Sequence, residues 1–135
     1  MAVNGVGSSV DIAVSGLRAQ SQRMQVIAEN LANAHTTRTA DGGPYRRREV
    51  VLRAGGDGPS GVTIETVRPD MENPLQRVRM PGHPDADADG YVTMPNVSIP
   101  SEMMNLVVAS RAYQANAAVL KRYQDSVDNA LELLR

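Results

Sequence analysis

The 135-residue chain contains no cysteine, phenylalanine or tryptophan, and four tyrosines are its only aromatic residues. Without cysteine the protein can form no disulfide and has no thiolate to use as a nucleophile or metal ligand. The length suits a single domain, but so few large aromatic side chains predict a thin hydrophobic core.

Long apolar runs and an excess of one charge are also missing. No run approaches the roughly 18 apolar residues of a membrane-spanning helix. The formal net charge is −1, which gives no electrostatic footprint for nucleic acid or an anionic membrane. Residues 1–9 lack the charged start and apolar core of a cleavable secretory signal. We therefore expect no nucleic-acid partner, no membrane span and no cleaved leader.

Sites for catalysis are equally scarce. His35 and His83 are the only histidines, and they lie about fifty residues apart with no helical spacing between them. A zinc site would have to draw its other ligands from carboxylates. The sequence contains no serine nucleophile elbow, no glycine-rich phosphate loop and no paired carboxylates on a rigid scaffold. It predicts neither an enzyme nor a bound cofactor.

The last third of the chain, residues 101–135, carries the strongest pattern. Apolar residues recur there at seven-residue steps, with a second apolar or small row three to four residues away. No glycine or proline follows Pro100, and residues 98–101 offer serine side chains for capping. The spacing predicts one long helix with a single seam to bury. The seven-residue row consists of Leu106, Tyr113, Leu120, Val127 and Leu134.

A second heptad pattern lies near the start of the chain. Ser8 and Asp11 resemble a capping box, which predicts that a helix begins there and that residues 1–7 form a frayed end. Small residues beside the seam, including Gly16, permit close approach of another backbone. The main row consists of Val10, Leu17, Met24 and Leu31, with Ala13, Ile27 and Ala34 in the complementary row.

Neither helix is expected to be stable alone, because burying five or six large side chains offsets only part of the entropy lost by ordering some thirty residues. The two seams match in kind. The predicted fold is therefore mainly α with a small β insert, in which the N- and C-terminal helices pair as an antiparallel coiled coil. We place the inter-helix or subunit contacts on Leu17, Met24, Ile27, Leu31, Leu106, Tyr113, Leu120, Val127 and Leu134.

The composition changes between the two helices. All eight prolines and eight of the eleven glycines fall in residues 36–100. Short strand-like runs occupy 45–53, 62–68, 75–80 and 91–94, and the glycine-rich residues 55–61 are typical of a hairpin loop. We expect an N-terminal helical segment 1–35, a β-rich or extended insert 36–100 and a C-terminal helical segment 101–135.

Two charged motifs in the insert need an interpretation. Residues 85–90, DADADG, match the first half of a calcium-binding loop, but position twelve is Asn96 and the flanks are not helical. An acidic turn whose carboxylates accept hydrogen bonds from their own backbone is the simpler interpretation. The triplet Arg46–Arg48 alternates along a predicted strand, so its charges divide between two faces. This favours a solvated or subunit-contacting strand over a nucleic-acid site.

The terminal helices also carry recognisable motifs. The stretches SGLRAQ at 15–20 and RMQVIAENLANA at 23–34 closely resemble the N-terminal signature of bacterial flagellar rod and hook proteins. SEMMNL at 101–106 and SRAYQAN at 110–116 are similar to the other end of that family. TTRTADGGPYRR at 36–47, GHPDAD at 82–87, GYV at 90–92 and PNV at 95–97 resemble its small proximal-rod members.

The resemblance implies a structural subunit of the flagellar basal-body rod, the axial shaft that transmits motor torque across the periplasm. It implies export by the flagellar type III pathway without signal cleavage. It also implies partners: other copies of the chain, other rod proteins, the export apparatus and the MS-ring base. Terminal helices that order on assembly fit such a subunit.

Two other functions remain open from the residues alone. A helical-hairpin adaptor that binds a partner coiled coil would be a compact folded monomer. A calcium-regulated binding module would require metal affinity at Asp85, Asp87 and Asp89.

Overall fold

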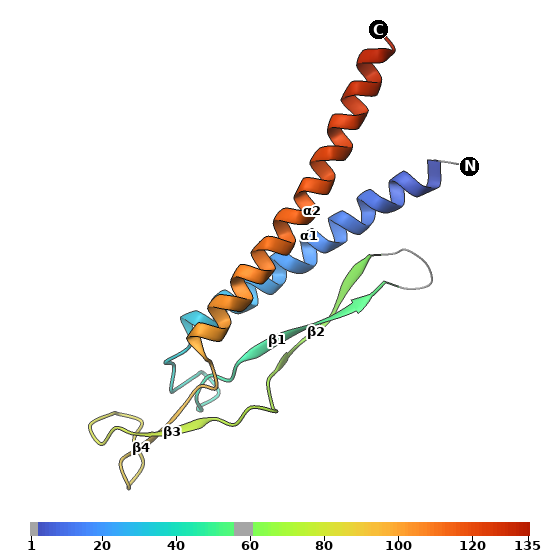
Figure 1. Cartoon of the computed structure of the whole chain (residues 1–135). Coiled ribbons are helices and arrows are strands. Elements are labelled where there is room, and N and C mark those ends of the chain that lie inside the picture. The colour runs from blue at the N-terminus through green and yellow to red at the C-terminus, as the bar shows by residue number, and fades with distance from the viewer. Residues whose placement is uncertain (1–2, 56–60) are drawn as a thin grey trace.

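The computed structural model describes residues 3–55 and 61–135, with side chains described from residue 9 onward. The chain has a long helix at each end, and four short strands lie between the two helices in the sequence (Figure 1). The elements in order are α1 (Val3–Ala32), β1 (Arg48–Ala54), β2 (Val62–Pro69), β3 (Gln76–Arg79), β4 (Tyr91–Met94) and α2 (Ile99–Leu133).

The two helices contain 30 and 35 residues, about half of the chain, so the prediction of a mainly α protein is too strong. The other half consists of two small antiparallel sheets and their connections. The helices run antiparallel, lie side by side near the C-terminal end of α1, and separate towards the two chain termini (Figure 1). The two terminal helices therefore lie together as predicted, but the predicted coiled coil between them is not confirmed.

The first helix begins earlier than the sequence indicated. The backbone is helical from Val3, so Ser8 lies inside α1, and the prediction of a capped start there was wrong. Two glycines lower the helix propensity of residues 3–8, at about 1 kcal/mol each, but no proline blocks the extension. A costly nucleus makes it easier to extend an existing helix than to start a new one.

The second helix also starts slightly early, at Ile99. Pro100 sits in its first turn, where a missing N–H costs nothing and the fixed φ angle favours the helix. The expected serine cap does not form, because the Ser98 hydroxyl donates to Ser101 Oγ at 3.1 Å and bonds no backbone N–H. The backbone N–H of Glu102 donates instead to the Ser98 carbonyl at 2.9 Å.

Strands β1 and β2 form the predicted hairpin. They pair antiparallel from Arg48 opposite Pro69 to Ala54 opposite Val62, with a bulge at Val51/Leu52. The Gly55 N–H donates to the Gly61 carbonyl at 2.8 Å across the base of the loop. The rest of the predicted loop, residues 56–60, lies outside the described residues.

Strand β4 has the predicted bounds, β2 and β3 differ from the predicted runs by one residue at one or both ends, and the largest difference is at the start of β1. β3 and β4 pair antiparallel as a separate two-stranded sheet at the end of the molecule away from the chain termini (Figure 1). β1 begins three residues after the predicted Tyr45. The preceding N–H groups are already used, because Tyr45 donates to the Thr36 carbonyl and Arg47 donates to Asn96 Oδ1.

The core is as thin as the composition implies. Its buried apolar side chains are mostly small, and the buried residues lie largely on α1. Between the helices, a side chain at Gly16 would place its Cβ 2.7 Å from Asn116 Nδ2, so only glycine leaves room for this contact. The buried hydrophobic residues are Ala13, Ala19, Val26, Ile27, Ala34, Val92 and Ala109.

This contact leads to a first prediction. Replacing Gly16 with valine should lower the free energy of unfolding by about 1–3 kcal/mol, because Asn116 must move away and the helices separate locally. Thermal and urea unfolding followed by circular dichroism would measure the loss. Ala28→Val is the matched control, since Ala28 is exposed on the same helix and only helix propensity changes. Equal losses in the two variants would contradict close packing at Gly16.

Candidate assembly surface

The exposed face of α2 is the most unusual surface of the molecule. Every residue from Lys121 to Arg135 is exposed, although apolar side chains recur among them at the helical spacing. We call four of these residues the distal stripe: Tyr123, Val127, Leu131 and Leu134, with exposed fractions of 38%, 39%, 57% and 84%. Soluble monomers rarely leave such a row uncovered, so the stripe has the character of an interaction surface.

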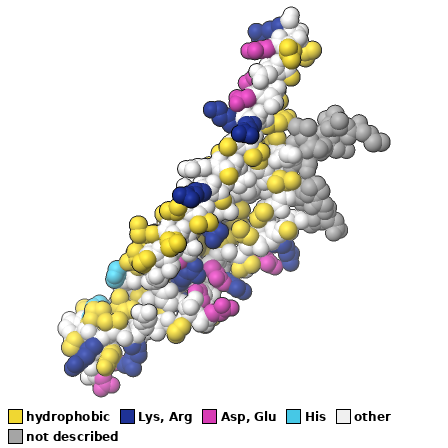
Figure 2. All heavy atoms as spheres, in the orientation of Figure 1, with side chains coloured by type: hydrophobic (Ala, Val, Ile, Leu, Met, Phe, Trp, Pro, Cys, Tyr) yellow, Lys and Arg dark blue, Asp and Glu magenta, His cyan; other side chains and the backbone are white. Residues whose placement is uncertain are grey.

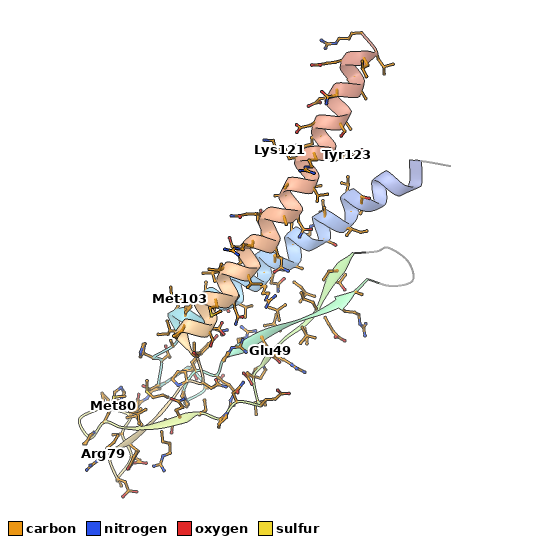
Figure 3. All side chains as sticks on the ribbon, viewed as in Figure 1. Glu49, Arg79, Met80, Met103, Lys121 and Tyr123 are labelled. Atoms are coloured by element: carbon orange, nitrogen blue, oxygen red, sulfur yellow. The ribbon has the colours of Figure 1, made fainter. Side chains whose placement is uncertain are left out.

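The stripe continues the face of α2 that packs on α1. Going back from Tyr123 in steps of three and four residues leads to Leu120, Asn116 and Ala109, which are half-buried or buried. Figure 3 shows Tyr123 and Lys121 on the part of α2 where the two helices have already separated. One seam therefore runs along the whole helix, covered at its start and open at its end.

A second apolar area lies at the start of α2, away from this seam. We call it the outer patch, and Figure 2 shows hydrophobic side chains gathered over these first turns. Met103 lies on the side of α2 away from β1 and β2 (Figure 3). The patch consists of Met103, Met104, Val107 and Val108, with exposed fractions between 52% and 71%.

The predicted contact residues divide according to position along the helices. Ile27 is buried, and five others are half-buried where α1 and α2 lie together: Leu17, Met24, Leu31, Leu106 and Leu120. Tyr113 is 38% exposed and lines a shallow groove with Leu17. Val127 and Leu134 are exposed and belong to the distal stripe. Whether the whole set mediates contacts between subunits stays a prediction.

The helix pair is held to the insert by polar groups. Asn30, near the end of α1, is 1% exposed. Its Nδ2 donates to the Arg48 carbonyl at 2.9 Å and to Glu102 Oε2 at 3.0 Å. Its Oδ1 accepts from the Arg48 N–H at 2.9 Å and from the Tyr45 hydroxyl at 2.8 Å. One amide thereby joins α1 to β1 and α2, with its full hydrogen-bonding capacity used.

Glu102, in the first turn of α2, is also 1% exposed. Its second oxygen, Oε1, accepts from Arg47 Nε at 2.6 Å. Arg47 Nη1 lies 3.3 Å from Asp70 Oδ2, so one guanidinium bridges two carboxylates from different segments. Burial by itself lowers the Arg47 pKa, but the hydrogen bond and charge of Glu102 outweigh it, and the pKa is raised. Arg47 is therefore held in its charged form.

Asp70 completes this network at the end of β2. Its Oδ1 accepts from the N–H groups of Glu72 and Asn73 at 3.0 and 3.1 Å, which forms a tight turn. Asn96 stabilises the turn, since its Nδ2 donates to the carbonyls of Asp70 and Asn73. We call these residues the buried polar cluster: Asn30, Arg47, Asp70, Asn96 and Glu102.

The sequence singled out only part of this cluster. Asn30 falls in the predicted N-terminal helix and Arg47 in the basic triplet, but Asp70, Asn96 and the burial of Glu102 were missed. The basic triplet was expected to alternate along a strand and divide its charges between faces, but β1 begins only at Arg48, and Arg46 and Arg47 both contact Asp70. Arg46 Nη1 donates to the Asp70 carbonyl, Arg47 turns inward, and Arg48 lies 3.5 Å from Glu29. An arginine flanked by two arginines carries no local signal that it alone pairs with the buried Glu102.

The acidic segment forms the turn that the sequence favoured. Asp87 Oδ1 accepts from the N–H groups of Asp89 and Tyr91 at 3.0 and 2.9 Å, and Asp87 Oδ2 pairs with Arg77. Asp85 pairs with Arg38 and accepts from the Thr37 hydroxyl at 2.6 Å. Within residues 3–55 and 61–135, no three histidine or acidic side chains gather where a metal ion could bind.

Two family models match the ends of the chain. The model described as "Flagella basal body rod protein" matches residues 11–38, which lie in α1 and the loop after it. The model described as "Flagellar basal body rod FlgEFG protein C-terminal" matches residues 88–133, which include β4 and α2. The two matched regions carry the helix pair together with Asn30 and Glu102.

Full-length relatives agree with these matches. The flagellar basal-body rod protein FlgC of Salmonella typhimurium is 45% identical over 126 residues, covering 91% of this chain and 93% of that protein. The chain belongs to the FlgC family of flagellar basal-body rod proteins. FlgC of Borreliella burgdorferi is 36% identical and covers 97% of this chain and 99% of its own length. FlgC of Bacillus subtilis is 34% identical, with coverages of 93% and 95%.

Membership in the FlgC family makes this chain a structural subunit of the flagellar basal body rod and not an enzyme. The two sequence features that led to this family, the matching heptads and the terminal signatures, lie on the helices that carry the exposed seam. Among the described helices, none is both long enough and apolar enough to cross a membrane.

The cluster leads to a prediction about pH. The Asp70 pKa is lowered from 3.8, chiefly by the Asn73 side-chain amide and backbone N–H, and more weakly by Arg47. A lowered carboxyl pKa stabilises the folded state above the unfolded pKa of about 3.9, and this contribution is lost as pH falls through the folded value. Urea unfolding should therefore show wild type losing more stability than Asp70→Asn between pH 7 and pH 3.

The asparagine variant keeps an oxygen that can accept from the N–H groups of Glu72 and Asn73, but an NH₂ group replaces the Oδ2 acceptor, so the test compares pH dependences and not absolute stabilities. Asp41→Asn serves as the control because Asp41 is exposed and lies outside the cluster. This control should follow the wild-type pH dependence. Identical pH dependence in wild type and Asp70→Asn would contradict the assignment.

Proposed function

We propose that this FlgC-family subunit enters the rod by covering the distal stripe of α2 with helices of neighbouring subunits. The observation that supports this is the continuity of the seam, since the same face that packs on α1 runs on through Tyr123, Val127 and Leu131 with no cover. A heptad seam is satisfied by another helix, which makes an intersubunit coiled coil the natural arrangement. Fully burying an exposed leucine contributes roughly 1.5–3 kcal/mol, so Leu134 would gain most and the partly covered Tyr123 and Val127 less.

The asymmetry of the subunit supports a helical assembly. Its open seam lies at one end of the molecule and its β3–β4 sheet lies at the other (Figure 1). A contact that joins different surfaces of successive subunits, without closing into a ring, generates an open helix. The partners in this proposal are other copies of the chain and other rod proteins, with the MS-ring base below them.

Torque transmission follows from the same contacts. Close-packed side chains deform little, so seams filled along the shaft resist twisting. The buried polar cluster joins the insert to the helix pair within each subunit, so rotation of the helix pair carries the insert with it. In this proposal the rod lies in the periplasm, and the subunit reaches it by the flagellar type III export pathway.

A substitution in the distal stripe tests the assembly proposal. Val127→Asp should abolish incorporation into the rod and therefore swimming, because an aspartate in a buried helical seam costs several kcal/mol. Helix content of the purified chain should stay unchanged, since the Val127 side chain is exposed and not part of the core. Swimming and isolated basal bodies would be scored in a flagellated strain that depends on this protein.

The matched control is Asn129→Asp, which adds the same charge on an exposed position two residues away and off the stripe. Cells carrying this change should swim normally. The proposal fails if Val127→Asp cells also assemble complete rods.

Hydrogen exchange tests whether the distal part of α2 becomes ordered when the subunit assembles. In the free subunit, amides from Lys121 to Leu133 should exchange much faster than those of residues 102–120, because only the latter pack on α1. Assembled rods should protect both parts of α2. The first half of the helix serves as the internal reference. Strong protection of the distal part in the free subunit would argue instead for a self-contained helical hairpin.

A further inference from the structure

The apolar seam alone does not determine the register of α1 against α2. In the observed register Gly16 lies against Asn116, and Asn30 lies against Glu102. The buried apolar residues between these points are small or aliphatic and include Ala109 and Ile27. A heptad pattern repeats after seven residues, so a shift of α2 by seven residues again places seam against seam.

One such shift is well tolerated by the seam. Moving α2 by seven residues brings Ala109 into the place of Asn116 against Gly16, which keeps small residues at the closest approach. The same shift carries Glu102 to the level of Arg23, where an ion pair would compensate part of its charge. Packing of the helices therefore discriminates weakly between the observed register and this one.

The buried polar cluster does discriminate. In the observed register both Glu102 oxygens are occupied, by Asn30 Nδ2 at 3.0 Å and Arg47 Nε at 2.6 Å. After the shift Asn30 would face Pro95, which precedes α2. Arg47 would keep Asp70 and the more distant Glu49 but lose Glu102, and the bond from Asn30 to α2 would be lost. Buried polar groups left without partners are costly, which is how a single buried polar residue selects one helix register.

We propose that Glu102 is the positioning residue that selects the register of the helix pair and, through Arg47, the placement of the insert on it. We assign it a role in specificity, because replacing a whole buried ion pair by apolar residues is often neutral or stabilising, whereas removing Glu102 alone leaves Arg47 and Asn30 without this partner. The inference concerns the isolated subunit and does not depend on how the rod assembles, so its failure and that of the proposed function are separable.

The experiment measures register directly. Because the chain has no cysteine, Ala28→Cys on α1 and Ala118→Cys on α2 provide two exposed sites for spin labels. Pulsed dipolar spectroscopy on the full chain, diluted with unlabelled protein, should give one narrow distance distribution. Glu102→Leu should add a second population with the axial separation changed by about 10 Å, the rise of seven helical residues.

Asn116→Ala is the matched control, since it removes another polar seam side chain, whose Nδ2 donates to the Ala112 carbonyl of its own helix. It should keep the single distribution. A purely stabilising role would lower the unfolding temperature of Glu102→Leu and leave one distance, which would overturn the proposal. If Glu102→Leu does not fold, Arg47→Leu/Glu102→Leu removes both charges, and a single wild-type distance there would overturn the proposal equally.

Discussion

The rest of the structure depends on the hydrogen bonds of one buried carboxylate, which lies where the end of α1 meets the start of α2. Glu102 is buried at the first turn of α2, where it meets Asn30 from α1 and Arg47 from the segment before β1. Its two partners lie 72 and 55 residues away in the sequence. Three distant segments therefore converge on one side chain, and the helix pair and the insert become a single unit there.

This arrangement explains how so small a core suffices. The buried apolar side chains are mainly alanine and valine, which bury little area each. Hydrogen bonds to charged groups are stronger than neutral ones and are directional, so the cluster supplies geometric precision that small apolar contacts lack. The molecule divides into a base with satisfied polar contacts and a distal end where every residue of α2 from Lys121 onward is exposed.

The parts of the fold predicted from sequence are those encoded by local periodicity. The long helices, the hairpin and the strand at residues 91–94 follow from heptads, alternation and turn residues. The cluster was hidden because Glu102 has the ordinary position of an acidic residue in a first helical turn, and Arg47 sits between two exposed or half-exposed arginines. Only the three-dimensional meeting of Asn30, Arg47 and Asp70 distinguishes them. The early start of α1 shows, in turn, that a plausible capping box is a weak boundary when no proline enforces it.

The separation of the helix ends has a mechanical consequence. A single subunit can bend easily near Lys121, because beyond that point α2 is a lone helix without lateral support. Its bending stiffness in a filament is set by the neighbours that enclose it and by how many of them are in place. A growing shaft of such subunits would gain rigidity gradually with each layer added, and its newest end would always be its most compliant part.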